Sequence, residues 1–326
     1  MSEAPRPALA TLECLPVEII QEIFLHALEV NFPRASIHIA RALSHPLMYS
    51  WIIRVAFSSL EDPSRNGFFT RDFLPEPLDP FAISPEERRG LQTAVLGCRW
   101  CTLPLMRRCQ REYLEHVVRR KCGDLVISPS DYQSLLSIGS QLSGLDGLIP
   151  NEPFNPDLCV QAKVRGSNRD SPLMVIFYFG MFVIRYDLFQ LPWGRQDMPA
   201  LVPDKLLCPP WTKSKLEFLQ ILTRFACIDE NADGTRSRRV LRQVIRDRDF
   251  ATFKRFMYMV VRVPWSKDLN FWPVHANHFH AALKYAEKPD DPFVSMLVKE
   301  RWDNVPKDDH KLQDALLTNL WANGTT

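Results

Sequence analysis

The 326-residue sequence contains little glycine, almost no net charge and no long apolar run. Its 40 Lys and Arg residues balance 38 Asp and Glu residues, so no overall charge draws the chain to nucleic acid or to an acidic membrane. The longest apolar run, Leu173–Ile184, is shorter than the roughly 20 residues that a membrane-spanning helix needs. Met1–Thr11 lacks the apolar stretch of a signal peptide. We therefore expect no membrane association and a cytoplasmic and/or nuclear location.

The signatures of common active sites are also missing. With only 12 glycines, the sequence has no glycine-rich phosphate loop, and it has neither a G-x-S-x-G nor an H-E-x-x-H motif. Its acidic pairs stand at expected helix starts, where carboxylates complement the helix dipole. These pairs are Glu86-Glu87, Asp290-Asp291 and Asp308-Asp309. We expect a protein that is not an enzyme and that uses no cofactor.

Eight cysteines are scattered along the chain, and four of them are close enough in sequence to suggest a zinc site. These are Cys98, Cys101, Cys109 and Cys122. A helix over 104–122 would hold Cys109 and Cys122 about 20 Å apart at about 1.5 Å per residue. Zn–S bonds of about 2.3 Å cannot span that distance. Buried, reduced thiols are therefore favoured over a metal site, and a redox pair is less favoured still.

Three histidines cluster in the sequence HANHFH, at His275, His278 and His280. On a helix, the first two would be neighbours at i and i+3 and could both reach a metal ion. No nearby carboxylate completes such a site. We favour a role in helix capping and packing, and we expect no metal.

Two basic stretches could bind phosphate groups. The first runs from Arg236 to Arg248, and the second runs from Arg107 to Lys121. Carboxylates such as Asp247 and Glu112 are interleaved with both stretches, which favours solvated helix faces. A partner-binding surface is the alternative for either stretch. We expect no nucleic-acid partner.

Apolar residues recur at helical spacing over most of the chain, and this pattern predicts a mainly α fold. The segment 15–29 has the apolar stripe of an amphipathic helix, with Pro16 in its first turn. A short helix over 34–43 and a third helix after Pro46 follow. Three helices this short cannot each bury an apolar face alone. They must pack together or against a partner.

The middle of the chain combines helices with two short strands. Ser84 and Glu87 form the sequence pattern of a capping box, which predicts a helix to about Leu96. A second helix is expected to run from residue 102 or 103 to Cys122. Met174–Phe179 and Met181–Tyr186 are rich in β-branched and aromatic residues around Gly180, which favours a small β-hairpin. One buried helix is the alternative there, and 187–212 is expected to be a loop.

Helical spacing returns after Thr212 and continues almost to the end of the chain. The predicted helices are 213–226, 236–246, 249–261, 275–287, 291–300 and 309–322. Apolar positions in the last part recur at an offset of 33 residues, which is the period of ankyrin repeats. These positions are Phe279, Ala282 and Leu283, repeated as Leu312, Ala315 and Leu316. The T-P-L-H-x-A signature is absent, so two unrelated helix pairs remain the alternative.

The opening Leu15-Pro16-Val17-Glu18-Ile19-Ile20, followed by Ile23-Phe24, resembles the start of an F-box, whose first helix begins L-P-x-E-[IL]. The stretches FPRA at 32–35 and ARALSHPL at 40–47 extend this likeness. Together these residues resemble a group of F-box-like proteins common in filamentous fungi. The resemblance covers about residues 12–57, and more loosely the whole chain.

The resemblance implies a substrate receptor of a Skp/cullin ubiquitin ligase, in which the first helices dock a Skp-type adaptor and the remainder binds a protein substrate. The adaptor-binding positions that it implies are Leu15, Pro16, Ile19, Ile20, Ile23 and Phe24. We therefore expect a non-catalytic protein-interaction module with three regions. These are an F-box-like helical segment (12–57), a central helical region with short β-strands (58–211) and C-terminal helical hairpins (212–326). The alternative is a helical scaffold protein with no role in ubiquitin ligation.

Overall fold

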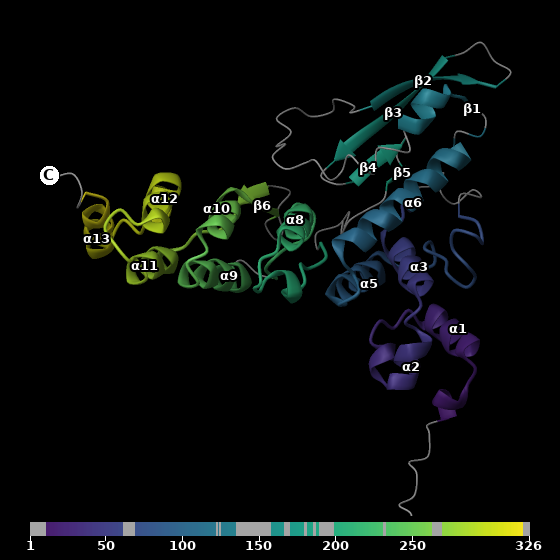
Figure 1. The fold of residues 1–326 in the computed structure, drawn as a ribbon, viewed down its shortest axis with the longest axis horizontal. Helices are drawn as coiled ribbons and strands as arrows, with labels where there is room; N and C mark the ends of the chain where they lie inside the picture. Colours follow the sequence, from purple (N-terminus) through teal and green to yellow (C-terminus); the bar gives the residue numbers. More distant parts are fainter. Residues whose placement is uncertain are drawn as a thin grey trace, which may run out of the picture. The chain divides into compact units, whose positions relative to one another are not determined.

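The computed structural model describes most of the chain, and it confirms a mainly α protein with small antiparallel sheets. The described residues are 11–60, 69–121, 123, 125–134, 158–165, 170–178, 181–184, 187–188, 199–230, 233–262 and 269–321. The chain divides into two compact units, Met1–Pro192 and Trp193–Thr326 (Figure 1). Each unit is described by itself below.

The first unit opens with three short helices, as the sequence predicts. These are α1 (Val17–Ala27), α2 (Ile37–Ala42) and α3 (Pro46–Phe57), with the 3-10 turns η1 (Thr11–Cys14) and η2 (Phe32–Arg34). The Ser36 hydroxyl caps α2 by accepting from the Ile39 N–H at 3.2 Å. Gln21 of α1 donates to the Ala42 carbonyl at 2.9 Å and so ties α1 to the end of α2. Helices α1 and α2 therefore pack together.

Helix α3 continues into the body of this unit, where it packs against α5 (Pro85–Gly97) and α6 (Leu103–Lys121). The predicted capping box at the start of α5 is confirmed, because both of its reciprocal hydrogen bonds between Ser84 and Glu87 are present. Gln92 of α5 donates to the Ala56 carbonyl of α3 at 2.9 Å. The apolar stripe of α6 is buried as predicted. It consists of Met106, Cys109, Tyr113 and Val117.

The same unit contains a five-stranded antiparallel sheet whose strands follow one another in chain order. The strands are β1 (Leu125–Val126), β2 (Leu158–Val164), β3 (Asp170–Tyr178), β4 (Met181–Ile184) and β5 (Asp187–Leu188). The predicted hairpin is confirmed as β3–β4, in register from Val175 opposite Ile184 to Tyr178 opposite Met181. Phe179 and Tyr186, predicted as strand ends, lie outside the described residues. The sheet is larger than predicted, and β5 lies where a loop was expected.

The second unit contains the six predicted C-terminal helices with shifted ends. They are α8 (Lys213–Leu222), α9 (Thr235–Arg246), α10 (Phe250–Tyr258), α11 (Ala276–Lys284), α12 (Pro292–Arg301) and α13 (His310–Trp321), with the 3-10 turns η4 (Asp204–Leu206) and η5 (Trp302–Asn304). The predicted helix over 249–261 is too long, because the chain leaves α10 at Tyr258 to form a strand. That strand, β6 (Val260–Arg262), pairs antiparallel with β7 (Leu269–Phe271), and this hairpin was not predicted.

These C-terminal helices form two layers. Helix α11 packs between α9 and α13, and α10 packs against α12 (Figure 1). Aromatic rings fill the space between helices, including Phe256 against Trp272 with ring centroids 4.4 Å apart. Trp272 also donates from its indole nitrogen to the Ser237 carbonyl of α9 at 3.3 Å. The region just before α8 belongs to this unit, since the Val202 N–H donates to the Cys227 carbonyl at 2.9 Å.

Candidate functional site

Helix α1 carries two apolar stripes rather than one. At 100° per residue, Ile20, Phe24 and Leu25 point to one side of the helix, and all three are buried. Pro16, Ile19 and Ile23 recur at i, i+3 and i+7 along the adjacent strip of the helix, and all three are exposed. The six residues predicted to bind an adaptor are therefore divided between the interior and the surface.

The buried stripe holds the three-helix segment together. Ile20 is 0% exposed and Phe24 is 5% exposed, and the Phe24 ring stacks on Phe32 with centroids 6.4 Å apart. Fully burying such a side chain contributes about 1.5–3 kcal/mol. These two residues are therefore needed for folding and cannot themselves reach a partner without rearrangement.

Within the described residues, the side chains of the exposed stripe keep more than a third of their apolar surface uncovered. Ile19 is 41% exposed and Ile23 is 36% exposed, while Leu15 at the start of the helix is half-buried. Glu18 and Glu22 lie beside this stripe and are exposed. Further large apolar side chains of the same three-helix segment are also exposed. They are Val17, Ile37 and Leu47. Exposed apolar side chains concentrated on a small segment make this segment a candidate interaction site.

The cysteines near the zinc-like spacing have buried or half-buried positions. Cys101 and Cys109 are buried, and Cys98 places its thiol 3.4 Å from the Ala94 carbonyl. Burial raises the pKa of the Cys109 thiol to about 11, so it stays protonated and a poor metal ligand at neutral pH. Cys122 lies outside the described residues. Among the described residues, no group of three His, Cys, Asp or Glu side chains is placed to hold a metal ion.

The histidine cluster caps and packs α11, as predicted. The His275 backbone N–H donates to Nδ1 of His278 at 2.9 Å, and Nε2 of His278 lies 3.1 Å from the Arg238 carbonyl of α9. His278 thus carries its proton on Nε2 and donates it to that carbonyl. Burial lowers the pKa of His278 to about 4. The third histidine, His280, is exposed and lies 3.6 Å from Asp309.

The first basic stretch is only partly a solvated face. Arg248 forms a two-pronged ion pair with Asp291, which is completely buried, and the guanidinium lies 4.4 Å from the centre of the Phe293 ring. Arg236 donates to the carbonyls of Ile228 and Val202 at 2.5 and 2.6 Å. The prediction of solvated arginines is therefore wrong for these two residues. Sequence spacing could not reveal these contacts, because Val202 lies 34 residues from Arg236 and Asp291 lies 43 residues from Arg248.

Helix α9, which contains Arg236 and ends just before Arg248, has no side-chain cap from its own N-cap residue. Gly234 at the N-cap has φ +61°, a left-handed conformation that glycine adopts without strain. The Asp229 carboxylate takes over the capping by accepting from the N–H groups of Arg236 and Ser237 at 2.7 and 3.2 Å. A buried carboxylate thus offsets the positive end of the α9 dipole.

One buried arginine in the first unit, Arg88, has no carboxylate partner among the described residues. Arg88 of α5 is 5% exposed and donates to the Ser58 carbonyl at the end of α3. Burial lowers the pKa of Arg88 to about 10, which leaves it protonated at neutral pH. Nearby, Arg54 of α3 pairs with Glu112 of α6 at 2.6 Å. These contacts hold the helices together and are not arranged around an open site.

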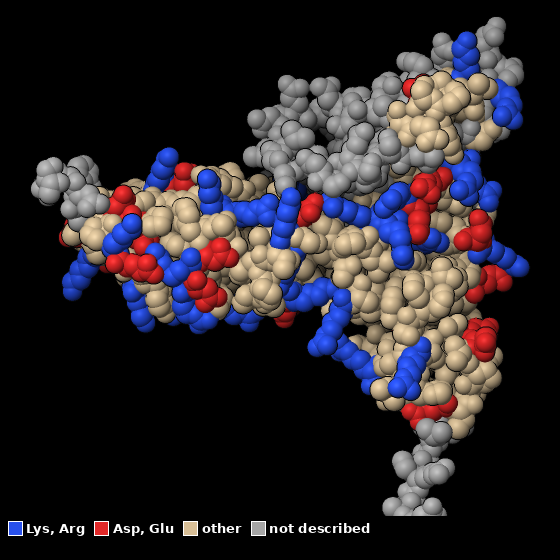
Figure 2. Space-filling model, in the orientation of Figure 1, with Lys and Arg blue, Asp and Glu red and all other residues tan. Residues whose placement is uncertain are grey.

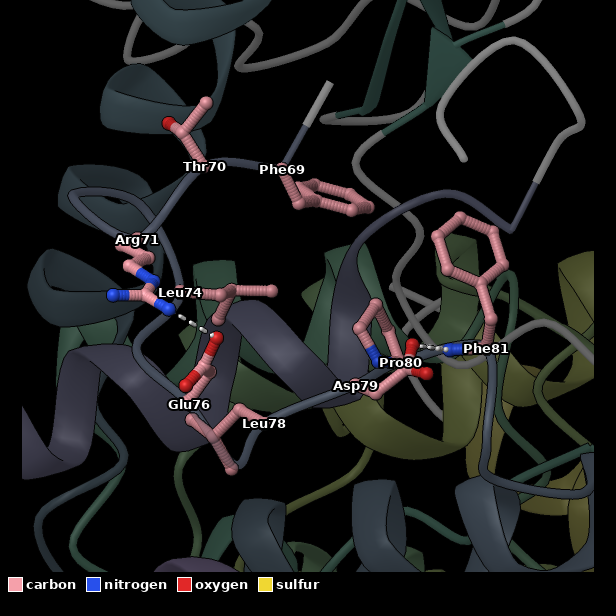
Figure 3. Close-up of a pocket in the computed structure, with 9 residues that line it drawn as sticks. All are labelled: Phe69, Thr70, Arg71, Leu74, Glu76, Leu78, Asp79, Pro80 and Phe81. Atoms are coloured by element: carbon pink, nitrogen blue, oxygen red, sulfur yellow. Dashed lines mark hydrogen bonds and ion pairs between the residues drawn. The ribbon is translucent and has the colours of Figure 1, made fainter. Parts of the chain in front are cut away.

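A cavity of about 490 Å³ lies within the irregular segment before α5 (Figure 3). Its lining residues are Phe69, Thr70, Arg71, Leu74, Glu76, Leu78, Asp79, Pro80 and Phe81. Arg71 and Glu76 form an exposed ion pair at 2.8 Å, and Asp79 accepts from the Phe81 N–H at 2.9 Å. The lining carboxylates are thus already engaged, and no acid, base and nucleophile converge in this part of the structure.

The described helices include none that is both long and apolar enough to cross a membrane. Comparisons of the chain with protein-family models, with curated proteins and with solved structures find no match. The likeness of the first helices to an F-box therefore depends on the residues quoted above. The best-supported candidate site is the exposed stripe of α1, formed by Pro16, Ile19 and Ile23.

Proposed function

We propose that this chain is a non-catalytic protein-interaction module of the F-box type. In this proposal α1 docks a Skp-type adaptor of a cullin ubiquitin ligase, and the C-terminal helices hold a protein substrate in the cytoplasm and/or nucleus. The observation that carries the proposal is the exposed stripe of Pro16, Ile19 and Ile23 on a helix whose adjacent stripe is buried. Anchors at i, i+3 and i+7 are the spacing with which a helix fills an apolar groove.

The two stripes of α1 have complementary roles in this proposal. Ile20 and Phe24 fix the helix on its own three-helix segment, so the exposed side is presented without a folding step. Binding then loses little conformational entropy, which raises affinity for a given contact area. Glu18 and Glu22 beside the stripe would lie at the polar rim of such an interface.

The second candidate function is a helical scaffold with no ligase role. It is supported by the two-layer arrangement of α9 to α13, in which the β6–β7 hairpin separates the pair α9–α10 from the pair α11–α12. Helix pairs separated by a turn or hairpin are the building plan of ankyrin-like repeats, which serve as binding surfaces. Both candidates use the C-terminal helices as a binding surface, and they differ only in what α1 does.

The test is co-purification of the full chain with the Skp-type adaptor of the same cell. The informative variant is Ile19→Asp/Ile23→Asp, because both side chains reach the surface and Ile20 and Phe24 do not. A variant at Ile20 and Phe24 would be unsuitable, since it introduces charges into the interior and unfolds the segment. Leu317→Asp is the matched control, because Leu317 is 40% exposed but lies on α13.

The adaptor-docking proposal expects the wild type and the Leu317→Asp variant to retain the adaptor, while Ile19→Asp/Ile23→Asp loses it. Circular dichroism must show unchanged helix content in all three chains. Retention by Ile19→Asp/Ile23→Asp, or no retention by the wild type, would contradict adaptor docking through α1. The scaffold function would then be the better description.

A further inference from the structure

Helix α9 has a one-sided charge. It contains five arginines and no Asp or Glu, with the sequence TRSRRVLRQVIR. The neighbouring helix α11, ANHFHAALK, also contains no carboxylate and ends with Lys284. Figure 2 shows Lys and Arg side chains projecting along the lower edge of the region where Figure 1 draws these two helices. This charge needs a physical explanation.

Only one of the five arginines is explained by the fold. Arg236 is held by the carbonyls of Ile228 and Val202 and by Asp204, whose carboxylate it contacts at 2.9 Å. Arg239 lies 3.6 Å from the same carboxylate of Asp204, which is already shared. Arg238 and Arg242 have no carboxylate within ion-pair distance among the described residues.

Arg239, Arg242 and Arg246 form a continuous stripe on the exposed side of α9. Their spacing of i, i+3 and i+7 places them on one side of the helix, opposite the buried Val240 and Val244. The side chains of Arg239 and Arg246 are 66% and 55% exposed. Arg246 donates to the Gln243 side-chain oxygen at 2.6 Å and lies 3.5 Å from the Asp247 carboxylate.

Helix α11 packs beside α9 and adds one exposed cation. The two helices lie with their N-terminal ends together, because His278 Nε2 bonds the Arg238 carbonyl at 3.1 Å and Trp272 reaches the Ser237 carbonyl. The exposed side of α11 carries Asn277, His280 and Lys284, and His280 lies 3.6 Å from the Asp309 carboxylate. Among the described residues, Lys284 contacts only the neighbouring Tyr285 ring, at 5.5 Å. The basic face is defined here as Arg239, Arg242, Arg246 and Lys284.

The basic face is unfavourable for α9 itself. The dipole favours only Arg246, which lies in the last turn of the helix. Arg242 stands four residues from both Arg238 and Arg246, and like charges at this spacing repel. Asp204 and Asp247 lie near Arg239 and Arg246, but no described carboxylate lies within ion-pair distance of Arg242. An anion from outside the helix would reduce the remaining repulsion.

We propose that the basic face of α9 and α11 binds an acidic, extended segment of a partner protein. Guanidinium groups form two-pronged hydrogen bonds with carboxylates, and Arg242 is free to do so. Successive arginines of the stripe are about 4.5–6 Å apart along the helix axis. Carboxylates at alternate positions of an extended chain are about 6.6 Å apart, which is close enough for flexible arginines to match.

The surroundings favour an acidic peptide over nucleic acid. Single-stranded nucleic acid is bound by exposed aromatic side chains on which bases stack. Among the described residues of this unit, the exposed large aromatic residues are Tyr258, Phe271 and Trp302, and none of them lies on α9 or α11. A duplex-binding protein commonly carries a large positive charge, whereas this chain has a formal charge of +2. The charge is local to one face.

The partner would be the substrate only if the proposed receptor function holds. Binding of an acidic segment to the basic face does not itself depend on adaptor docking. The two ideas can therefore fail separately, since one concerns α1 and the other concerns α9 and α11.

The probe is a fluorescein-labelled peptide of about 16 residues with alternating Glu and Ser, and binding to the full chain is followed by anisotropy. The variant is Arg242→Glu/Lys284→Glu. The matched control is Lys254→Glu/Lys299→Glu, which makes the same charge change on exposed lysines of α10 and α12. We expect the variant to weaken binding about tenfold or more and the control to change it less than about twofold. Raising the salt from about 50 to 300 mM should also weaken wild-type binding.

Three outcomes would overturn the proposal. The first is that the wild type does not bind the Glu-Ser peptide at low salt. The second is that the variant and the control lose binding equally. The third is that the wild type binds a single-stranded oligonucleotide of the same net charge more tightly than it binds the peptide. The Arg242→Glu/Lys284→Glu variant should still retain the adaptor if α1 docks it. The Ile19→Asp/Ile23→Asp variant should still bind the peptide. These crossed results separate a failure of this proposal from a failure of the receptor function.

Discussion

The three-helix segment α1–α3 and the stacked helices α9–α13 solve the same packing problem with different residues. Within the described residues 11–57, no buried side chain carries a charge. The unusual feature of the surface there is its exposed apolar side chains, such as Ile19 and Ile23. The stacked helices bury Asp291 and the polar ring of His278, and the unusual feature of their surface is the row of arginines on α9.

This difference predicts two kinds of response to solution conditions. Apolar contacts depend weakly on pH and are not weakened by moderate salt. Ion pairs and buried histidines depend on both. The stacked helices should therefore respond to pH and salt far more than the three-helix segment, and each of the following experiments would break or sharpen that contrast.

The largest effect is expected at the buried ion pair of the stacked helices. Asp291→Ala leaves Arg248 partly buried without its carboxylate and removes the cap on the Phe293 N–H, so it should destabilise this unit by about 3–5 kcal/mol. Urea unfolding followed by circular dichroism measures the change. Asp291→Asn is the control, because it keeps the capping oxygen and loses only the charge. Equal stability of Asp291→Ala and the wild type would show that the interior does not depend on this charge.

A somewhat smaller effect is expected in α1, where the two apolar stripes can be separated. Ile20→Ala should destabilise the three-helix segment by about 3 kcal/mol, because it leaves a cavity in the interior. Ile23→Ala, on the exposed stripe, should change stability by about 0.5 kcal/mol or less. Hydrogen exchange of the α1 amides reports both changes. Similar losses for the two variants would mean that α1 has one buried face rather than two distinct stripes.

The smallest of the three effects concerns pH. Burial lowers the His278 pKa to about 4, whereas a histidine in an unfolded chain titrates near 6.5. Between these values the unfolded chain binds a proton that the folded chain does not. The stabilisation is therefore fully present above about pH 6.5 and is lost as the pH falls towards 4, by up to about 3 kcal/mol.

Urea unfolding at pH 7, 5 and 4 measures this loss, and His278→Asn provides the control. The Asn side-chain oxygen can accept from the His275 N–H in place of Nδ1, yet it does not titrate. The variant should show a shallower fall in stability than the wild type over this range. Parallel pH profiles would assign the acid sensitivity to carboxylates elsewhere.

Local patterns predicted the helices well, because the signals that start a helix lie within four residues of one another. Ser84 and Glu87 specified the start of α5 through hydrogen bonds to each other's backbone. The β6–β7 hairpin was missed because its strands are three residues each, too short for alternation to be recognised. Within 249–261, the apolar residues of β6 could also be read as a further helical turn.

The candidate site was predicted less completely, for a reason visible in α1. Ile20, Ile23 and Phe24 fit one helical stripe, but spacing alone does not tell which side of an apolar helix faces the interior. The division into Ile20 and Phe24 inside and Ile23 outside depends on where α2 and η2 pack, including the Phe24–Phe32 contact. The ion pair of Arg248 with Asp291 was likewise invisible, because it joins residues 43 positions apart.

The hydrogen bonds of the Arg236 side chain have a consequence for the order of folding. One side chain bonds Val202, Asp204 and Ile228, and it can do so only once the first turn of α9 exists. Closing the intervening loops before that turn forms would cost chain entropy, and the backbone bonds between residues 200–202 and Cys227 would be gained without those of Arg236. Residues 199–207 should therefore gain their protection against hydrogen exchange after α9, and a pulse-labelling experiment during refolding would see them as the late-closing end of this unit.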